Sequence, residues 1–223
     1  MGKLIVIDGT DGSGKQTQLE ILENKLKENN IDYRKISFPN YNSPSSSLVK
    51  MYLSGEFGTD ADAISPYVAS TFFAVDRYAT YKKQLEEYYE NGGLILADRY
   101  TTANMVHQAG KIKDRSERKK FLDWLWNLEF NIYKIPIPTK VFFLNMPPEY
   151  SLKLIENRQN KFDKEAKKDI HESNRAYIQE SYEAACELAN DYKWTEIKCV
   201  NNGKIKTREE IGKEIFEVVK NVL

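Results

Sequence analysis

The stretch "GTDGSGKQ" at residues 9–16 constrains the fold most, because it separates an apolar run, "LIVID", from an amphipathic helical pattern. Gly9, Gly14 and Lys15 fit the spacing G-x-x-x-x-G-K of a phosphate-binding loop. Glycines in such a loop let backbone N–H groups turn toward phosphate oxygens, and the N-terminus of the following helix adds a favourable field. Strand, loop and helix follow in the order that this chemistry needs, so we predict a working phosphate-binding loop rather than a plain glycine turn.

The loop departs from the usual pattern at the position that contacts the metal. Gln16 stands where a Ser or Thr normally offers a hydroxyl to Mg²⁺, and the hydroxyl of Thr17 comes one residue late. Thr17 lies about 100° further round the helix, so it does not replace the missing ligand. A Gln amide oxygen can ligate Mg²⁺ weakly or hold a metal-bound water, and Mg²⁺ keeps several waters in protein sites. We therefore expect more of the metal shell to come from water and from a carboxylate elsewhere.

Apolar strands and helical patterns alternate along the 223 residues. Strands are predicted at residues 3–8, 32–38, 94–98, 140–146 and 194–200. Helices are predicted at residues 17–30, 65–91, 116–130, 147–158, 173–192 and 207–223. The alternation predicts a single α/β domain over residues 1–223, with a five-stranded parallel sheet and helices on both faces. Ligands of such sheets bind beyond the carboxyl ends of the strands.

Composition excludes several classes of partner. The 33 basic and 33 acidic side chains cancel, which leaves no overall positive field to hold a nucleic acid polymer. No apolar stretch is long enough to span a membrane, and "LIVI" is too short for the core of a signal peptide. Cys186 and Cys199 indicate reduced thiols rather than a disulfide or a metal site. We expect a soluble cytoplasmic protein with no nucleic acid or membrane partner.

Two classes of phosphate-loop protein compete for this sequence. A GTPase needs N-K-x-D at the end of a strand, but "NKFD" at residues 160–163 lies well past the fourth strand, and no D-x-x-G follows the third. The other class is a kinase of a small acceptor, which needs an aromatic surface for a base and cations for a phosphate. Phe73 and Arg77 share one helix face, and Asp98 and Arg99 end the third strand. Taken alone, Phe73 and Arg77 are explained more simply as a buried ring beside a surface ion pair. Asp98 and Arg99 are explained equally well as a structural salt bridge.

The order of several segments resembles the thymidylate kinase family of P-loop nucleoside monophosphate kinases over essentially the whole chain. These segments are "DGTDGSGKQTQ", "FPNY", "FFAVDRY", "DRYTTANMVHQAG" and "DIHE". The resemblance implies transfer of the ATP γ-phosphate to dTMP, with Mg²⁺, in a homodimer. Asp98 would support the metal or its waters, and Gln16 would contact it through water. The ATP-binding residues would be Gly9, Thr10, Asp11, Gly12, Ser13, Gly14, Lys15, Gln16 and Thr17.

The resemblance also implies how the sugar and phosphate of dTMP are held. Asp11 would contact the 3′-hydroxyl of the sugar. Tyr41, in "FPNY", and Arg99 would bind the acceptor phosphate. Asn40 stands where many members have an Arg, so Arg99 would carry more of the phosphate's charge.

The base would be read by three side chains. Phe73 would stack on thymine, Arg77 would reach its O4 and Asn104 its N3 edge. His107 stands where many members have a Tyr near the 2′ carbon of the sugar, so it is a candidate contact of the acceptor. His171, in "DIHE", would lie near the acceptor in a closed lid.

The last catalytic group implied by the family is a mobile cation. Some members carry an Arg in the phosphate loop, where this chain has Gly12, and others place it in a lid. Residues 157–172 are charged without a clear apolar stripe, which indicates an exposed, mobile segment, and Arg158 and Lys161 lie at its start. Such a cation can supply charge to the transferring phosphoryl group while the lid excludes water. The catalytic residues are therefore predicted as Lys15, Asp98, Arg99 and Arg158.

Two alternatives stay open from the sequence. The chain could phosphorylate another deoxynucleoside or monophosphate, although an acceptor without phosphate would leave Arg99 and Tyr41 unexplained. It could also bind nucleotide without catalysis, which the unusual Gln16 motivates.

Overall fold

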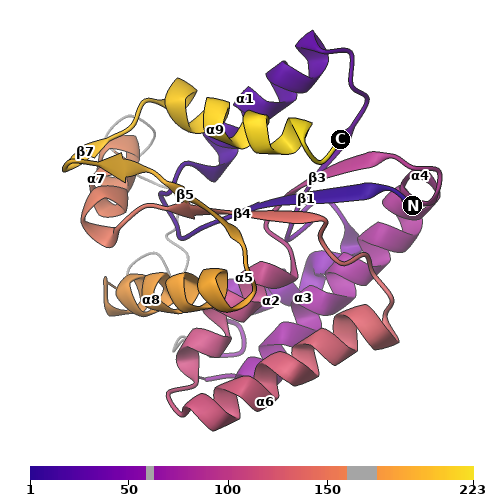
Figure 1. The fold of residues 1–223 in the computed structure, drawn as a ribbon. Coiled ribbons are helices and arrows are strands. Elements are labelled where there is room, and N and C mark those ends of the chain that lie inside the picture. Colours follow the sequence, from indigo (N-terminus) through magenta and orange to yellow (C-terminus); the bar gives the residue numbers. More distant parts are fainter. Residues whose placement is uncertain (59–62, 160–174) are drawn as a thin grey trace.

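Five parallel strands form the centre of the molecule in the order β2-β3-β1-β4-β5 (Figure 1). They are β1 (Lys3–Asp8), β2 (Arg34–Ser37), β3 (Leu94–Asp98), β4 (Lys140–Asn145) and β5 (Thr195–Lys198). This computed structural model describes residues 1–58, 63–159 and 175–223. Ile5 of β1 pairs with Leu96 on one side and Lys140 on the other, so the strand before the phosphate loop lies in the middle. The predicted five-stranded parallel sheet is confirmed.

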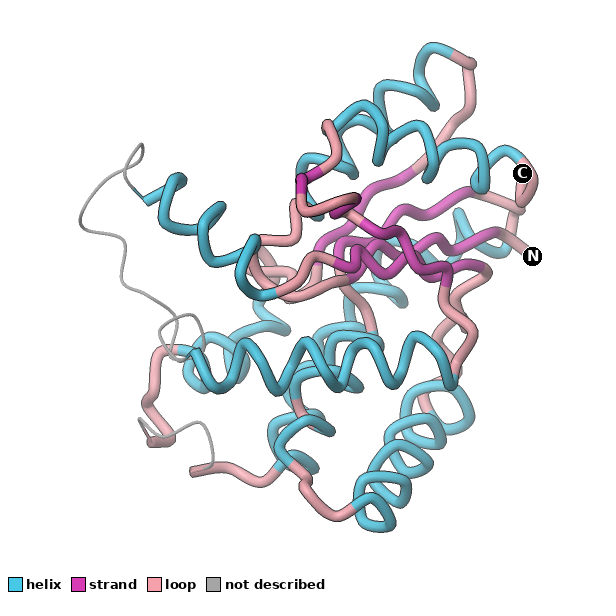
Figure 2. Tube along the Cα trace, turned by 60° about the vertical axis from the view of Figure 1, so that its left-hand side comes forward, coloured by secondary structure: helices cyan, strands magenta, loops and turns pink. Residues whose placement is uncertain are grey.

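Helices cover both faces of this sheet, as Figure 2 shows from a second side. On one face lie α1 (Lys15–Glu28) and α9 (Arg208–Lys220), and Ile5 and Ile7 pack among their apolar side chains. The other face is covered by α3 (Pro66–Thr80), α5 (Thr101–His107), α6 (Arg115–Trp126) and α8 (Arg175–Asp191) (Figure 1). Leu4 and Val6 join a cluster on that side. Since successive side chains of a strand point to opposite faces, a strand buried on both faces is apolar throughout. This is why "LIVI" could be recognised as a buried strand.

Besides these helices, the structure has the helical segments η1 (Pro44–Ser46), α2 (Ser47–Leu53), α4 (Glu86–Glu90), η3 (Ala109–Lys111) and α7 (Pro148–Gln159). Two π-helical turns, η2 (Tyr81–Leu85) and η4 (Asn127–Ile132), continue α3 and α6. The helix predicted at 65–91 is therefore one continuous helical stretch, whose hydrogen bonds change from α-helical to π-helical spacing along part of its length. Its start is also as predicted, with Pro66 in the first turn and the Ser65 side chain accepting from the Val68 N–H.

Two short α-helices and one hairpin were not predicted from the sequence. The helices α2 and α5 have seven residues each, which is too short for a clear helical period. The strand predicted at 194–200 ends earlier, and β6 (Val200–Asn201) and β7 (Lys204–Ile205) form an antiparallel hairpin instead. Asn202 and Gly203 have φ of 49° and 74° in its turn. The dipeptide Asn-Gly is a strong hairpin signal and could have revealed it.

The structure also bears on three other predictions, which concern membrane-spanning helices, the two cysteines and the lid. Within the described ranges, no helix is both long and apolar enough to cross a bilayer. Cys186 of α8 and Cys199 after β5 are free thiols, the first half-buried and the second buried. The lid predicted at 157–172 begins in the last turn of α7, and its residues 160–172 lie outside the described part.

Candidate active site

The phosphate loop is shaped by glycines with positive φ. Gly14, which precedes α1, has φ of 89°, and Gly12 has φ of 76°, a left-handed conformation that side chains disfavour. A Cβ atom on Gly12 would lie 2.7 Å from the carbonyl oxygen of Ser151 in α7. The loop therefore passes too close to α7 for any side chain at this position, so a catalytic Arg could not be placed here without moving the backbone.

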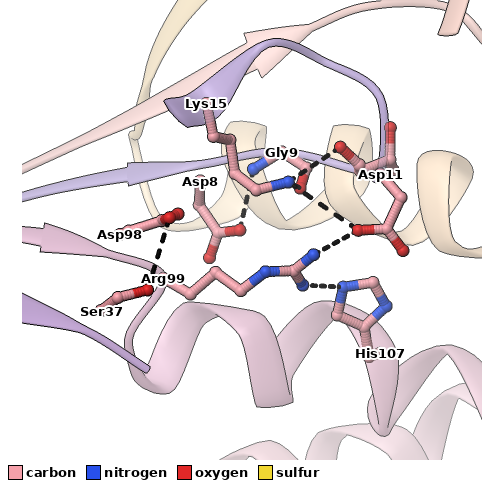
Figure 3. A network of polar contacts seen from close by, with 9 residues as sticks. Asp8, Gly9, Asp11, Lys15, Ser37, Asp98, Arg99 and His107 are labelled. Atoms are coloured by element: carbon pink, nitrogen blue, oxygen red, sulfur yellow. Dashed lines mark hydrogen bonds and ion pairs between the residues drawn. The ribbon is translucent and has the colours of Figure 1, made fainter. Parts of the chain in front are cut away.

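Lys15 lies across the loop and contacts its carbonyl groups. Its Nζ donates to the carbonyl oxygens of Gly9 at 2.8 Å and Thr10 at 3.0 Å, and it lies 4.0 Å from Asp11 Oδ1 (Figure 3). Burial, aided by the nearby Arg99 guanidinium, lowers the pKa of Lys15 to about 8, against the opposing effect of Asp11. The loop thus holds a lysine whose charge is easily lost in alkaline solution.

Arg99 connects the end of β3 to the phosphate loop. Its backbone has φ of 62°, an uncommon conformation for a residue with a side chain. Its guanidinium forms an ion pair with Asp11, and Nη1 lies 2.8 Å from His107 Nε2 on α5 (Figure 3). Although burial opposes it, the charges of Arg99 and Lys15 lower the pKa of the Asp11 carboxyl well below its usual range. Lys15 of the loop and Arg99, which follows β3, therefore share the carboxylate of Asp11.

Two further carboxylates lie at the carboxyl ends of neighbouring strands. Asp8 is buried, accepts from the Gly9 N–H at 2.8 Å and also bonds the Thr102 hydroxyl. Burial raises the pKa of Asp8 despite the nearby Arg99. Asp98 Oδ2 accepts from the Ser37 hydroxyl at 3.4 Å, whereas Asp98 Oδ1 is buried with no partner among the described residues.

The Oδ1 atom of Asp98, which has no partner among the described residues, is relevant to the expected Mg²⁺ site. A buried carboxylate oxygen without a donor is costly unless a cation or an ordered water satisfies it. The buried hydroxyls of Thr10 and Ser13 likewise have no partner in the described ranges. Those ranges contain no cluster of three His, Cys, Asp or Glu side chains that could form a metal cage. The donor set therefore fits Mg²⁺ that takes one carboxylate and fills its remaining positions with waters and substrate oxygens.

Gln16 points away from this set of groups. Its side chain is exposed, and Nε2 donates to Glu20 Oε1 at 3.1 Å, one turn further along α1. Thr17 is half-buried on the same helix. The expected contact of Gln16 with the metal through water stays a prediction, since its amide is bonded to a surface carboxylate here.

The segment that carries Tyr41 is tied to α3 by Asp76. This buried carboxylate accepts from the Asn40 N–H at 2.8 Å and from the Ser45 hydroxyl at 2.6 Å. The Asn40 side chain donates to Thr80 Oγ1 at 3.2 Å, which is a further contact between this segment and α3. Tyr41 itself is exposed. Sequence analysis missed Asp76, because nothing in "VDRY" distinguishes a buried anchor from a surface charge.

Two of the predicted base-reading residues lie on α3 and α5, which pack together. Phe73 is half-buried and meets the ring of Tyr52 edge-on, with 6.1 Å between ring centroids. Asn104 is buried, and its Nδ2 donates to the Ser70 carbonyl oxygen of α3 at 3.3 Å. The pair of helices therefore carries both an aromatic face and an amide.

Arg77, the third of these residues, forms an ion pair that is buried rather than on the surface. Its Nε and Nη2 donate to Glu129 at 2.7 Å and 2.5 Å. Both side chains are almost completely buried. The simpler interpretation from sequence, a surface ion pair beside Phe73, is wrong about burial, because the partner comes from a segment 52 residues away.

The structure thus brings Lys15, Asp11, Arg99 and His107 into one network, and places Asp98 beside it (Figure 3). Arg158 lies in the last turn of α7, but its side chain is not among those described. His171 lies outside the described residues altogether. The roles expected of these two lid residues stay predictions.

Known proteins resemble this chain over most of its length. A family model described as "Thymidylate kinase" matches residues 7–211. The thymidylate kinase of Plasmodium falciparum (isolate 3D7) is 26% identical over 182 residues, which cover 81% of this chain and 80% of that protein. The probable thymidylate kinase of Pyrococcus horikoshii is 26% identical over 224 residues, covering 100% and 98%. A solved structure of thymidylate kinase from Candida albicans shares the fold, with a TM-score of 0.73, 22% identity and coverage of 99% and 92%.

Proposed function

The chain belongs to the thymidylate kinase family, and from this premise we propose that it transfers the γ-phosphate of ATP to dTMP, giving dTDP and ADP. One observation carries the proposal beyond the family match. Lys15 of the donor loop and Arg99 of the acceptor side converge on the carboxylate of Asp11. A donor phosphate beside Lys15 and an acceptor phosphate beside Arg99 would therefore lie next to each other.

Phosphoryl transfer asks the protein for position and charge more than for covalent chemistry. We propose that Lys15 and the loop N–H groups bind the donor phosphates, and that Arg99 exchanges part of its pairing with Asp11 for the acceptor phosphate. Asp11 would then accept a hydrogen bond from the 3′-hydroxyl of the sugar. Apart from this exchange, the fold already holds these groups in place, so little further reorganisation opposes the reaction.

A magnesium ion fits the carboxylate that the structure leaves unsatisfied. We propose that Asp98, through its buried Oδ1, holds Mg²⁺ or a water bound to it. When bound, the ion would neutralise charge on the phosphate oxygens. The Ser37 hydroxyl, which donates to the other oxygen of Asp98, would fix the orientation of the carboxylate.

The exposed face of α3 supports the homodimer that the family resemblance implies. Val68, Val75 and Tyr78 are 47%, 42% and 38% exposed. Their spacing of seven and three residues places them along one side of the helix. We propose that two copies pack through this stripe, which sedimentation velocity would test with Val75→Glu as the disrupting variant.

Release of ADP from Mg·ATP tests the proposed reaction, with dTMP, dUMP, dCMP, dGMP, UMP and thymidine each offered as acceptor. Turnover should be fastest with dTMP, and Lys15→Met should abolish it. Turnover with thymidine but not dTMP would instead indicate a nucleoside kinase. ATP binding without acceptor-dependent turnover would indicate a protein that holds nucleotide but does not catalyse transfer.

A further inference from the structure

His107 and Arg99 form a hydrogen bond whose direction follows from their chemistry. Nη1 of Arg99 lies 2.8 Å from Nε2 of His107 (Figure 3). A guanidinium has only N–H donors, whereas a neutral imidazole has one donor nitrogen and one acceptor nitrogen. Nε2 is therefore the acceptor, and the proton of the neutral ring lies on Nδ1. This contact thus requires one protonation state and one tautomer of His107.

Two neighbours hold the Arg99 guanidinium from different elements. Asp11 of the phosphate loop pairs with Nη2, and His107 at the end of α5 pairs with Nη1. The backbone of Arg99 is also fixed, because its N–H donates to the carbonyl oxygen of Ile7 in β1 at 3.2 Å. Loop, strand and helix therefore set the direction of this guanidinium together.

The helix that carries His107 is anchored at two points before it reaches that residue. Near its start, the hydroxyl of Thr102 donates to the buried carboxylate of Asp8 in β1. In its middle, Asn104 Nδ2 donates to a carbonyl oxygen of α3 at 3.3 Å. A side chain on a helix that the fold holds in this way places its partner more precisely than one on a loop. His107, half-buried in the last turn of α5, is therefore suited to positioning Arg99.

The two partners of Arg99 differ in what they do to its charge. The Asp11 carboxylate neutralises the guanidinium as well as orienting it, so an acceptor phosphate must compete with this pairing. A neutral imidazole orients the guanidinium and leaves its positive charge to act on a phosphate. When Arg99 exchanges part of its pairing with Asp11 in the proposed reaction, its bond to His107 can persist.

We propose that His107 is a positioning residue, whose neutral ring holds Arg99 toward the acceptor phosphate while Asp11 releases it. This inference rests on the proposed function and goes beyond the acceptor contact expected of His107, because the ring acts through Arg99 without touching the nucleotide. It also predicts how the site responds to pH. A protonated imidazole carries N–H on both nitrogens, so it cannot accept the bond and would place a second cation beside Arg99.

The charges that act on His107 come from the phosphate loop and from Arg99. Asp11 favours a protonated ring, whereas Arg99, and Lys15 beyond Asp11, oppose it. Charged side chains on α3, η3 and the middle of α8, which pack around α5, are bonded to other partners; these are Asp76, Arg77, Lys111, Glu180, Glu183 and Glu187. Among the described residues, the balance between Asp11 and the two cations therefore governs protonation of the ring.

Two substitutions at His107 test the assignment. His107→Phe keeps a flat ring without an acceptor, so KM for dTMP should rise ~10-fold or more while KM for ATP stays unchanged. His107→Gln brings an amide oxygen near the position of Nε2, so it should recover most of the affinity that His107→Phe loses. Thermal melting confirms that both variants fold. An unchanged KM for dTMP in His107→Phe, or an equal loss in both variants, would overturn the inference.

The pH profile separates positioning from packing, because a Gln side chain does not titrate. An imidazole usually titrates near pH 6.5, so kcat/KM for dTMP in the wild type should fall about fivefold or more from pH 7.5 to pH 5.5 relative to His107→Gln. The ratio of the two proteins cancels the titration of the dTMP phosphate, which is common to both. A ratio that stays constant over this range would overturn the inference.

Measurements without turnover distinguish failure of this inference from failure of the proposed reaction. Calorimetry gives Kd for dTMP, and proton–nitrogen correlation spectra give the tautomer of His107, whose signals are assigned by their loss in His107→Gln. Weaker dTMP binding by His107→Phe, with the Nδ1–H tautomer in the wild type at pH 7.5, supports the inference even if no phosphate is transferred. Transfer to dTMP by a wild type whose neutral His107 carries its proton on Nε2 would overturn the inference and leave the reaction standing.

Discussion

The ammonium group of Lys15 donates a 2.8 Å hydrogen bond to the carbonyl oxygen of Gly9, at the other end of the same loop. A second bond of 3.0 Å reaches the carbonyl oxygen of Thr10. These two acceptors hold the lysine across the loop, with Arg99 nearby as a competing cation. The two carbonyl oxygens therefore stabilise the positive charge of Lys15, which burial and the nearby Arg99 destabilise.

The first prediction concerns nucleotide binding at alkaline pH. Because the pKa of Lys15 is lowered to about 8, ATP must bind with uptake of a proton above that pH, and its affinity should fall by up to about tenfold per pH unit. Calorimetry at pH 8.5 in two buffers of different ionisation enthalpy would measure the uptake. Lys15→Arg, which stays charged, should show none. An equal affinity at pH 7 and pH 9 in the wild type would contradict the prediction.

Unfolding of the protein does not account for this loss of ATP affinity at high pH. The folded-state pKa of Lys15, about 8, lies below its ordinary value of 10.5, so between these values the unfolded chain binds more protons than the folded one. The contribution of Lys15 to the free energy of unfolding therefore increases as pH rises through this window. Urea titrations at pH 7.5 and 9.5 would check the sign with Lys15→Met as reference.

The second prediction uses the backbone of Arg99. Arg99→Ala should lower kcat/KM for dTMP ~10²-fold or more, because a cation that we propose to bind the acceptor phosphate is lost. Arg99→Gly should be equally inactive. With φ of 62° at this position, however, the glycine variant should be about 1 kcal/mol more stable than the alanine variant. Urea denaturation compares the two, and equal stabilities would argue against backbone strain.

The sheet and the phosphate loop could be predicted because their signals are local. β1, β3 and β4 are apolar runs bounded by turn residues, and "LILAD" at 94–98 coincides with the observed strand. The loop follows from the spacing of Gly9, Gly14 and Lys15, which lie within seven residues. Such elements can be recognised from local sequence, because their signals are apolar runs and motif spacings that lie within a few residues.

The anchors of the site could not be predicted for the opposite reason. Glu129 acts on Arg77 across 52 residues, and Thr102 on Asp8 across 94. Each looks like an ordinary helix residue in the sequence, and only the packing of α3, α5 and η4 decides which charges are buried. Gln16 could not be assigned either, because its partner Glu20 is one of several carboxylates along α1.

The third prediction concerns Asp76 and the segment that carries Tyr41. Asp76→Ala leaves the Asn40 N–H and the Ser45 hydroxyl without their acceptor, which should cost ~2–3 kcal/mol of unfolding free energy. KM for dTMP should rise about tenfold, since a residue proposed to bind the acceptor phosphate loses its support. Ser45→Ala, which removes one of these two donors to Asp76 together with the contact between the Ser45 and Ser43 hydroxyls, should cost less than Asp76→Ala. Calorimetric melting and steady-state kinetics measure the two effects, and an unchanged KM in Asp76→Ala would separate this segment from the acceptor site.

The last prediction concerns Gln16, which stands where a phosphate-binding loop normally has a Ser or Thr. Since the amide of Gln16 is bonded to Glu20 on the surface of α1, Gln16→Ala should leave the Mg²⁺ concentration for half-maximal activity unchanged. Gln16→Thr should lower that concentration about threefold or more, because a hydroxyl beside Lys15 would add a direct ligand to the shell that we propose for Mg²⁺, made of Asp98, water and substrate oxygens. Glu20→Ala, which frees the amide from its partner, serves as the control and should behave as the wild type does. A higher Mg²⁺ requirement in Gln16→Ala would mean that the amide turns inward and contributes to the metal site during turnover.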